Sequence, residues 1–386
     1  MFFEHYNIST EKSIAITGLL SNITTRPDSH KGGWARLLKC QLVNLGYSNV
    51  KIIDNKDSIL DFDVVIFDLG AEFSGALNMF GGLDEKVFKR LTELKNFSGD
   101  LFSWRNELPS ILTLSGRRSN ASSCEAFKQT PETFLSEVQE VLNKTKVFEH
   151  AYLTKKVLIG DSHTPSVWTP DFMIERRDGR SLKGMLEHKT IHKIVNTNFR
   201  FHGMDIDTVH VHCGSIDIRH HVMRESNGFE YTFKLASELL NQLMNIDDAH
   251  LIVTHTMGIE DESRELPKTG YYKGTPFYGS WHDRNLCRIT FNSVMNDFRK
   301  LDSDVEVIKL PEYFFDENGK LRFEVMEKPQ SVHTSPEHYR WDLDQNKLRW
   351  TKEHDIKKQT EFAVKNISAD LEKVMYGKRR DTTSND

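Results

Sequence analysis

The chain of 386 residues lacks several features that mark disulfide-rich, zinc-binding, membrane and secreted proteins. It holds four cysteines, Cys40, Cys124, Cys213 and Cys287, whose wide spacing matches neither a disulfide framework nor a zinc site. No apolar run approaches the ~20 residues of a transmembrane helix. The first residues lack the basic and apolar regions of a secretory signal. We therefore expect buried free thiols in a cytoplasmic protein with no membrane partner.

Neither sign of charge dominates the sequence. Lys and Arg number 51 and Asp and Glu 56, so the formal net charge is −5. That balance gives no overall attraction to nucleic acid, although a local basic groove would still allow such a partner. With 38% hydrophobic and 28% charged residues, the chain is long enough for two globular domains. We expect a small-molecule, sugar or nucleotide substrate, and the oligomeric state stays open.

Short apolar runs alternate with amphipathic segments along the chain, which predicts parallel sheets joined by crossover helices. We predict an α/β fold with two Rossmann-like three-layer domains and mainly parallel sheets. The domains are 1–148 and 149–345, followed by a carboxyl-terminal helix and basic tail at 346–386. The expected strands are 13–18, 49–54, 63–68, 100–104, 157–160, 205–213, 249–254 and 305–310. The expected helices are 34–45, 84–96, 131–144, 231–245, 285–301 and 352–375.

One strand ends abruptly in chemistry-bearing residues. The apolar run Val157–Ile159 is followed by Gly160, Asp161, Ser162 and His163. Ligands of open α/β sheets bind beyond the carboxyl ends of the strands, so a serine beside an Asp and a His there is placed for nucleophilic attack. The alternative is a tight turn in which Asp161 or Ser162 caps the next helix.

A second strand, Val209–Cys213, also runs into a glycine turn, Gly214-Ser215-Ile216-Asp217. Together the two segments resemble the SGNH (GDSL-like) hydrolase family over about residues 150–345. The resemblance implies that Ser162 attacks, that His333 in Ser331-Val332-His333-Thr334 takes its proton, and that Asp161 supports the turn. It also implies that Gly214, Ser215 and Asp217 shape the oxyanion side.

The sequence departs from the family pattern at two helper positions. Ile216 stands where the family has an oxyanion asparagine, and Gln330 stands three residues before His333, where the family often has Asp. His338 is an alternative base. Loss of one oxyanion donor costs on the order of a hundredfold to a thousandfold in turnover. Either other groups substitute, among them Ser215, His220 and backbone N–H groups, or the fold serves a different chemistry.

Further polar groups accompany these motifs. Arg219 and His220 follow the second motif, and we expect them to contact substrate beside Ser162. Histidines are dense between His188 and His221, but they complete no recognised ligand set, so we predict no metal site.

The amino-terminal domain offers a different chemistry. His30, Gly32 and Gly33 precede a helix after the first strand, where backbone N–H groups can approach a phosphate. In this respect the domain looks like one half of a Rossmann-type glycosyltransferase. The structural alternative is that the glycines only permit close helix–strand packing.

We therefore expect an enzyme, an SGNH-like hydrolase or transferase acting on an acyl or related group of a sugar- or nucleotide-bearing substrate. Two alternatives stay open. One is a phage-type glycosyltransferase that modifies hydroxymethylated DNA bases with a nucleotide sugar as donor. The other is a non-catalytic binding protein on the same fold. No further cofactor is expected.

Overall fold

The computed structural model describes residues 6–18, 34–54, 56–68, 85–103, 131–148, 153–176, 179–199, 206–259, 274, 277–301, 305–328 and 331–380. The chain divides into two compact units. Residues 1–158, 170–175 and 195–208 form the first, and residues 159–169, 176–194 and 209–386 form the second. Each unit contains helices and a five-stranded sheet or the larger part of one, which confirms the predicted α/β class with two mainly parallel sheets.

The first sheet has the strand order β2-β1-β3-β4-β5, and every neighbouring pair is parallel. Its strands are β1 (Ile14–Gly18), β2 (Val50–Ile52), β3 (Val64–Asp68), β4 (Asp100–Ser103) and β5 (Lys146–Val147). The helices among its described residues are α2 (Trp34–Asn44), α4 (Glu85–Asn96) and α7 (Pro131–Asn143). The expected strands and helices of this unit are present, and β5 was not expected from the sequence.

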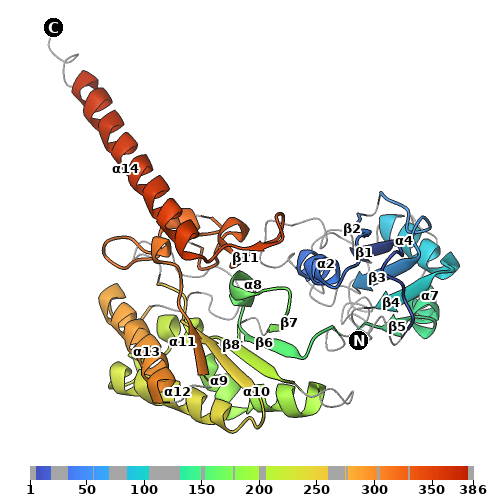
Figure 1. Ribbon diagram of the computed structural model, residues 1–386, viewed down its shortest axis with the longest axis horizontal. Helices are drawn as coiled ribbons and strands as arrows, with labels where there is room; N and C mark the ends of the chain where they lie inside the picture. Colours follow the sequence, from blue (N-terminus) through green and yellow to red (C-terminus); the bar gives the residue numbers. More distant parts are fainter. Residues whose placement is uncertain are drawn as a thin grey trace. The chain divides into compact units, whose positions relative to one another are not determined.

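Alternation along the buried strands divides the core of this unit into two layers. In β3, Val64 and Ile66 belong to the cluster that includes Leu38 and Leu42 of α2. Val65 and Phe67 belong to the cluster that includes residues of α4 and α7. Successive side chains of a strand point to opposite faces, so α2 covers one face of the sheet while α4 and α7 cover the other (Figure 1).

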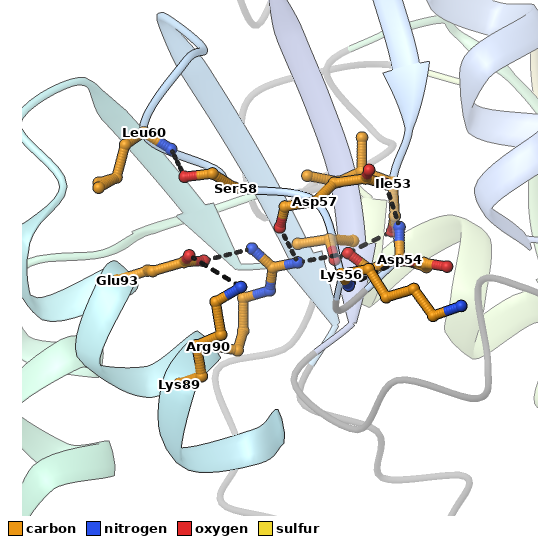
Figure 2. A network of polar contacts seen from close by, with 10 residues as sticks. Ile53, Asp54, Lys56, Asp57, Ser58, Leu60, Lys89, Arg90 and Glu93 are labelled. Atoms are coloured by element: carbon orange, nitrogen blue, oxygen red, sulfur yellow. Dashed lines mark hydrogen bonds and ion pairs between the residues drawn. The ribbon is translucent and has the colours of Figure 1, made fainter. Parts of the chain in front are cut away.

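A buried arginine ties α4 to the chain that follows β2. Arg90 is 1% exposed. Its guanidinium donates to the carbonyl oxygens of Asp54 and Asp57 at 2.6 and 3.1 Å and to Glu93 at 2.7 Å, as Figure 2 shows. Buried charge is tolerated only when it is paired and hydrogen-bonded, and here the partners include two backbone carbonyls. Arg90 therefore has a structural role in the first unit.

The second sheet has the order β10-β9-β8-β6-β7, and β9 and β10 pair in parallel. Its strands are β6 (Lys156–Gly160), β7 (Met173–Arg176), β8 (Thr208–His212), β9 (His250–Thr254) and β10 (Val305–Ile308). The α-helices in this part of the chain are α8 (Thr164–Val167), α9 (Leu182–Glu187), α10 (Thr190–Lys193), α11 (Ser215–His220), α12 (Gly228–Met244), α13 (Trp281–Leu301) and α14 (Lys352–Arg380). Helices α12, α13 and α14 were expected from the sequence, and the alternative for the turn at Asp161 and Ser162 included a helix where α8 lies. The sequence did not predict α9, α10, α11 or β7.

Shorter elements complete this part of the chain. A π-helix spans Ile194–Phe199, and 3-10 turns span Val222–Arg224, Glu312–Phe314, Phe323–Val325 and Pro336–His338. β11 (Trp341–Asp342) and β12 (Lys347–Leu348) form an antiparallel hairpin. The carboxyl-terminal helix α14 continues through the basic residues to Arg380 rather than ending near Met375 (Figure 1). None of the described helices is long and apolar enough to cross a membrane.

A separate apolar cluster holds the chain between β10 and the hairpin. It contains Tyr313, Phe314, Val325 and Met326, together with Phe362 of α14. This cluster matters for the site because the segment that it anchors carries His333. Three of the four cysteines, Cys40, Cys213 and Cys287, are buried free thiols, as predicted, while Cys124 lies outside the described residues.

Replacing Arg90 by methionine is expected to lower the free energy of unfolding by about 3 kcal/mol, because two buried carbonyls and Glu93 lose their donor. Lys89→Met is the matched control. Lys89 precedes Arg90 on the same helix, its side chain is 51% exposed, and its ion pair with Glu93 is 4.0 Å long. Its loss should cost less than about 0.5 kcal/mol. Equal effects in denaturant unfolding of the two variants would contradict the assignment.

Candidate active site

Adjacent strands of the second sheet approach each other closely where β6 ends. A Cβ atom added to Gly160 would lie 1.9 Å from the carbonyl oxygen of His212 on β8. Only glycine fits this position without a backbone shift. The Asp161 N–H donates to the same His212 oxygen at 3.4 Å. The start of the turn that follows β6 is therefore held against the end of β8.

Asp161 shapes the turn that presents the candidate nucleophile. It is 1% exposed, and its carboxylate accepts a hydrogen bond from the His163 N–H at 2.9 Å. The Thr164 hydroxyl donates to the Asp161 carbonyl oxygen at 2.9 Å, at the start of α8. An Asp side chain that accepts from the backbone two residues later is a standard turn device. Ser162, between Asp161 and His163, is only half-buried.

The structure brings together two residues that the sequence analysis proposed as nucleophile and base. His333 Nε2 lies 2.8 Å from Ser162 Oγ, although 171 positions separate them in the chain. In a neutral imidazole one ring nitrogen accepts and the other donates. If the Ser162 hydroxyl donates to Nε2, the ring proton is on Nδ1. This is the tautomer that a general base for Ser162 requires.

A carboxylate stands on the far side of the imidazole ring. Glu327 Oε2 lies 3.9 Å from His333 Nδ1, and both side chains are less than a fifth exposed. This separation is that of an ion pair rather than a hydrogen bond. Catalytic contacts are often long before substrate binds. Ser162, His333 and Glu327 thus form a serine–histidine–glutamate series within the second unit.

Local backbone pairing holds Glu327 opposite His333. The Glu327 N–H donates to the His333 carbonyl oxygen at 2.8 Å, and Met326 pairs with Thr334 in an antiparallel bridge. The Ser331 hydroxyl oxygen accepts from the His333 N–H at 3.1 Å. The backbones of Glu327 and His333 therefore pair directly, and this pairing holds the carboxylate and the base opposite each other.

The second motif forms the start of α11. Gly214 has φ +100°, a left-handed conformation that favours glycine. Ser215 is 3% exposed, and its hydroxyl oxygen has no hydrogen-bond partner among the described residues. Ile216 is half-buried and apolar, so its side chain supplies no donor at the position where the SGNH pattern has asparagine.

Asp217 is turned toward a neighbouring helix. Its buried carboxylate accepts hydrogen bonds from the backbone N–H groups of Leu182 and Lys183, the latter at 3.1 Å. These amides belong to the first turn of α9, where helical N–H groups lack intrahelical partners. Asp217 therefore joins α11 to α9. This role differs from the direct contribution to the oxyanion side that the resemblance implied.

Arg219 lies against the turn that carries Ser162. It is 4% exposed, and its Nη1 is 3.5 Å from His163 Nε2. The His163 ring in turn packs on the His333 ring, with 5.1 Å between ring centroids. His220 packs on Phe277 instead, at 5.3 Å between ring centroids. Arg219 is thus close to the reacting residues, and His220 packs against an aromatic ring.

Other candidate residues fall into two groups. His30, Gly32, Gly33 and Gln330 lie outside the described residues. His338, the alternative base, is a core residue whose ring bonds the Tyr313 hydroxyl and the Glu324 carbonyl. Burial lowers the pKa of His338 to about 4. No group of three metal-ligating side chains occurs in the part of the chain that the structure describes.

Sequence reasoning missed Glu327 and the role of His163. The SGNH pattern places a carboxylate three residues before the base, whereas Glu327 is six residues before His333. Pro329, between the two, was an available turn signal. His163 was seen as a neighbour of Ser162, but nothing in the sequence indicated its contacts with Arg219 and His333.

Comparisons with known proteins give remote structural likenesses. No family model matches the sequence, and no curated protein matches it. A Streptococcus pneumonia structure provisionally described as a platelet activating factor is 17% identical and has a TM-score of 0.33; the match covers 59% of this chain and 97% of that one. A "possible lipase" from Chitinophaga pinensis is 13% identical with a TM-score of 0.26, over 45% and 71% of the two chains.

The stability of the second unit should depend on pH through Asp217. Burial is the largest influence on this carboxyl and raises its pKa from 3.8 to about 6. The folded state then favours the protonated form. The contribution of Asp217 to the free energy of unfolding is complete below pH 3.8 and is lost as the pH rises through about 6, a change of about 3 kcal/mol.

Asp217→Asn should remove this pH-dependent step, so its stability relative to the unmodified protein should rise between pH 4 and pH 7. Denaturant unfolding at several pH values measures the difference. Asp171→Asn is the control, because the Asp171 side chain is 52% exposed. A difference between Asp217→Asn and the unmodified protein that is constant across this range would contradict the assignment.

Proposed function

We propose that this protein is a serine-dependent acyl hydrolase or acyltransferase in which Ser162 is the nucleophile. The observation that carries the proposal is the 2.8 Å contact between Ser162 Oγ and His333 Nε2, with Glu327 beyond the ring. A serine hydroxyl is a weak nucleophile by itself and becomes effective when an adjacent base takes its proton. The half-buried Ser162 meets that requirement at the end of a strand, where α/β sheets bind ligands.

The reaction proceeds in two acyl-transfer steps. Ser162 Oγ attacks the carbonyl carbon of an ester while its proton passes to His333 Nε2. The tetrahedral intermediate collapses, the bond to the alcohol breaks, and the alcohol leaves with the proton from His333. Water in a hydrolase, or an acceptor hydroxyl in a transferase, then attacks the acyl carbon while His333 Nε2 takes its proton. The bond from the acyl carbon to Ser162 Oγ breaks, the acid or the new ester leaves, and His333 returns the proton to Ser162 Oγ. Glu327 orients the ring and stabilises its protonated form.

Groups other than asparagine stabilise the negative charge on the carbonyl oxygen in this proposal. The left-handed turn at Gly214 leads into α11, and the backbone N–H groups of this turn are candidate donors. Backbone N–H groups of the Gly160–His163 turn are further candidates. Donors already oriented in a buried site act without reorganisation during the reaction. Asp161 and Asp217 contribute indirectly, because each fixes the backbone that presents these groups.

A sugar- or nucleotide-bearing acyl substrate is the substrate class in this proposal. The glycosyltransferase and non-catalytic alternatives stay predictions, since the described residues carry no contact that favours either. The acyl proposal makes demands that neither alternative makes, namely an activated Ser162 and dependence on His333 and Glu327.

A fluorophosphonate probe applied to the full-length protein tests the proposal directly. The unmodified protein should be labelled at Ser162, and Ser162→Ala should not be labelled. His333→Ala should lower the labelling rate by at least about 10³-fold, because the hydroxyl loses its base. His338→Ala is the matched histidine control for effects on reactivity, judged in samples that stay folded. Labelling that persists in Ser162→Ala, or absence of labelling in the unmodified protein, would contradict an activated Ser162.

Glu327→Gln should lower kcat for a 4-nitrophenyl ester by about 100-fold with little change in KM, because the neutral amide cannot stabilise the imidazolium. Glu337→Gln is the control, since Glu337 also pairs with a histidine but its side chain is 69% exposed. The control should retain nearly full activity. Unchanged kcat in a folded Glu327→Gln protein would remove Glu327 from the series.

A further inference from the structure

A buried arginine lies next to the reacting residues and is not used by the proposed acyl-transfer mechanism. Arg219 is 4% exposed, and a guanidinium group only donates hydrogen bonds. Its Nη1 is 3.5 Å from His163 Nε2. The His163 ring packs on the ring of His333, the proposed base. One residue therefore links Arg219 to the base, and the same residue adjoins Ser162 in the chain.

The face of α11 that carries Arg219 also carries Ser215. The two are four positions apart, so they lie one above the other on the helix. Asp217, between them, is turned to α9 and accepts from its amides. The Ser215 hydroxyl oxygen is buried without a hydrogen-bond partner among the described residues. Such a group in a folded protein calls for an explanation, and a bound ligand is one.

Charge is distributed unevenly across this site. Three carboxylates have contacts in this region: Glu327 lies beyond His333, one Asp161 oxygen accepts from the His163 N–H, and Asp217 accepts from the amides of α9. Burial lowers the pKa of His212, whose ring lies 6.3 Å from that of His163, to about 4, so it is neutral at pH 7. The Glu327 carboxylate thus lies beyond the His333 ring, and the Arg219 guanidinium belongs to α11.

We propose that Arg219 and Ser215 form an anion subsite beside Ser162, and that the acyl substrate carries a carboxylate or phosphate group close to its reacting ester. The planar guanidinium fits both groups through paired N–H donors, and a hydroxyl supplies a further hydrogen bond. This inference rests on the proposed function, because it names the substrate class of the same site. Binding of a substrate anion by Arg219 differs from stabilisation of the oxyanion. Oxyanion stabilisation would raise the rate for charged and neutral esters alike.

The test compares two esters that differ only in charge. One is the 4-nitrophenyl monoester of glutaric acid, and the other is the same compound with its free carboxylate methylated. The unmodified protein should prefer the anionic ester in kcat/KM by at least about tenfold, the size expected of a charge-assisted hydrogen bond. Arg219→Met should bring that ratio close to one, and Arg219→Lys should keep part of it. Ser162→Ala gives the uncatalysed background.

Arg224→Met is the matched control. Arg224 follows closely in the chain but is exposed, and its guanidinium lies over the Tyr278 ring. Removing it changes the net charge by the same amount, and the preference for the anionic ester should persist. A folded Arg219→Met protein that keeps the preference, or that loses activity equally on both esters, would overturn the anion subsite.

Binding to the Ser162→Ala protein separates this inference from the proposed function and distinguishes the two anions. Monomethyl glutarate and inorganic phosphate are titrated calorimetrically into Ser162→Ala and into Ser162→Ala with Arg219→Met. At least one anion should bind the first protein and bind the second at least about tenfold more weakly. Binding without turnover of either ester would retain the subsite and reject the acyl chemistry. Absence of Arg219-dependent binding of both anions would overturn the subsite.

Discussion

The close approach of β6 and β8 at Gly160 is the constraint on which the candidate site depends. The His212 carbonyl oxygen occupies the space that any larger residue at position 160 would need. Because the strands meet there, the turn after β6 and the helix α11 after β8 emerge at the same edge of the sheet. Asp161 then fixes the turn through the His163 N–H. The nucleophile, its neighbour and the face of α11 are brought together by backbone packing rather than by direct attraction among them.

The proposed base reaches this edge by a different route. The bend that carries Glu327 and His333 is closed by their own backbone hydrogen bond and by the bridge between Met326 and Thr334. The apolar cluster that includes Phe314 and Phe362 anchors the chain that leads to it. Ordering a long segment costs conformational entropy, and this buried cluster offsets part of that cost. Packing remote from Ser162 therefore sets the position of the His333 ring.

Two buried arginines illustrate how placement decides the role of a charge. The Arg90 guanidinium is surrounded by carbonyl oxygens and by Glu93, all on segments that it joins within the first unit. Arg219, also buried, has its Nη1 3.5 Å from His163 Nε2, next to Ser162. Arg90 stabilises a loop. Arg219 lies where its positive charge would attract a substrate anion in the proposed subsite, and the Ser215 hydroxyl lies on the same face of α11.

Sequence alone determined the α/β class and most of the strands, because buried parallel strands are short β-branched runs with a local pattern. The family resemblance proposed Ser162 and His333, and the structure places their side chains 2.8 Å apart. The sequence did not reveal Glu327, because a six-residue offset across a bend has no local signature. It also missed that Asp217 binds the amides of α9 and that His163 links Arg219 to His333. Those relations are hydrogen bonds and ring contacts between distant segments, and only the tertiary structure decides which distant segments meet.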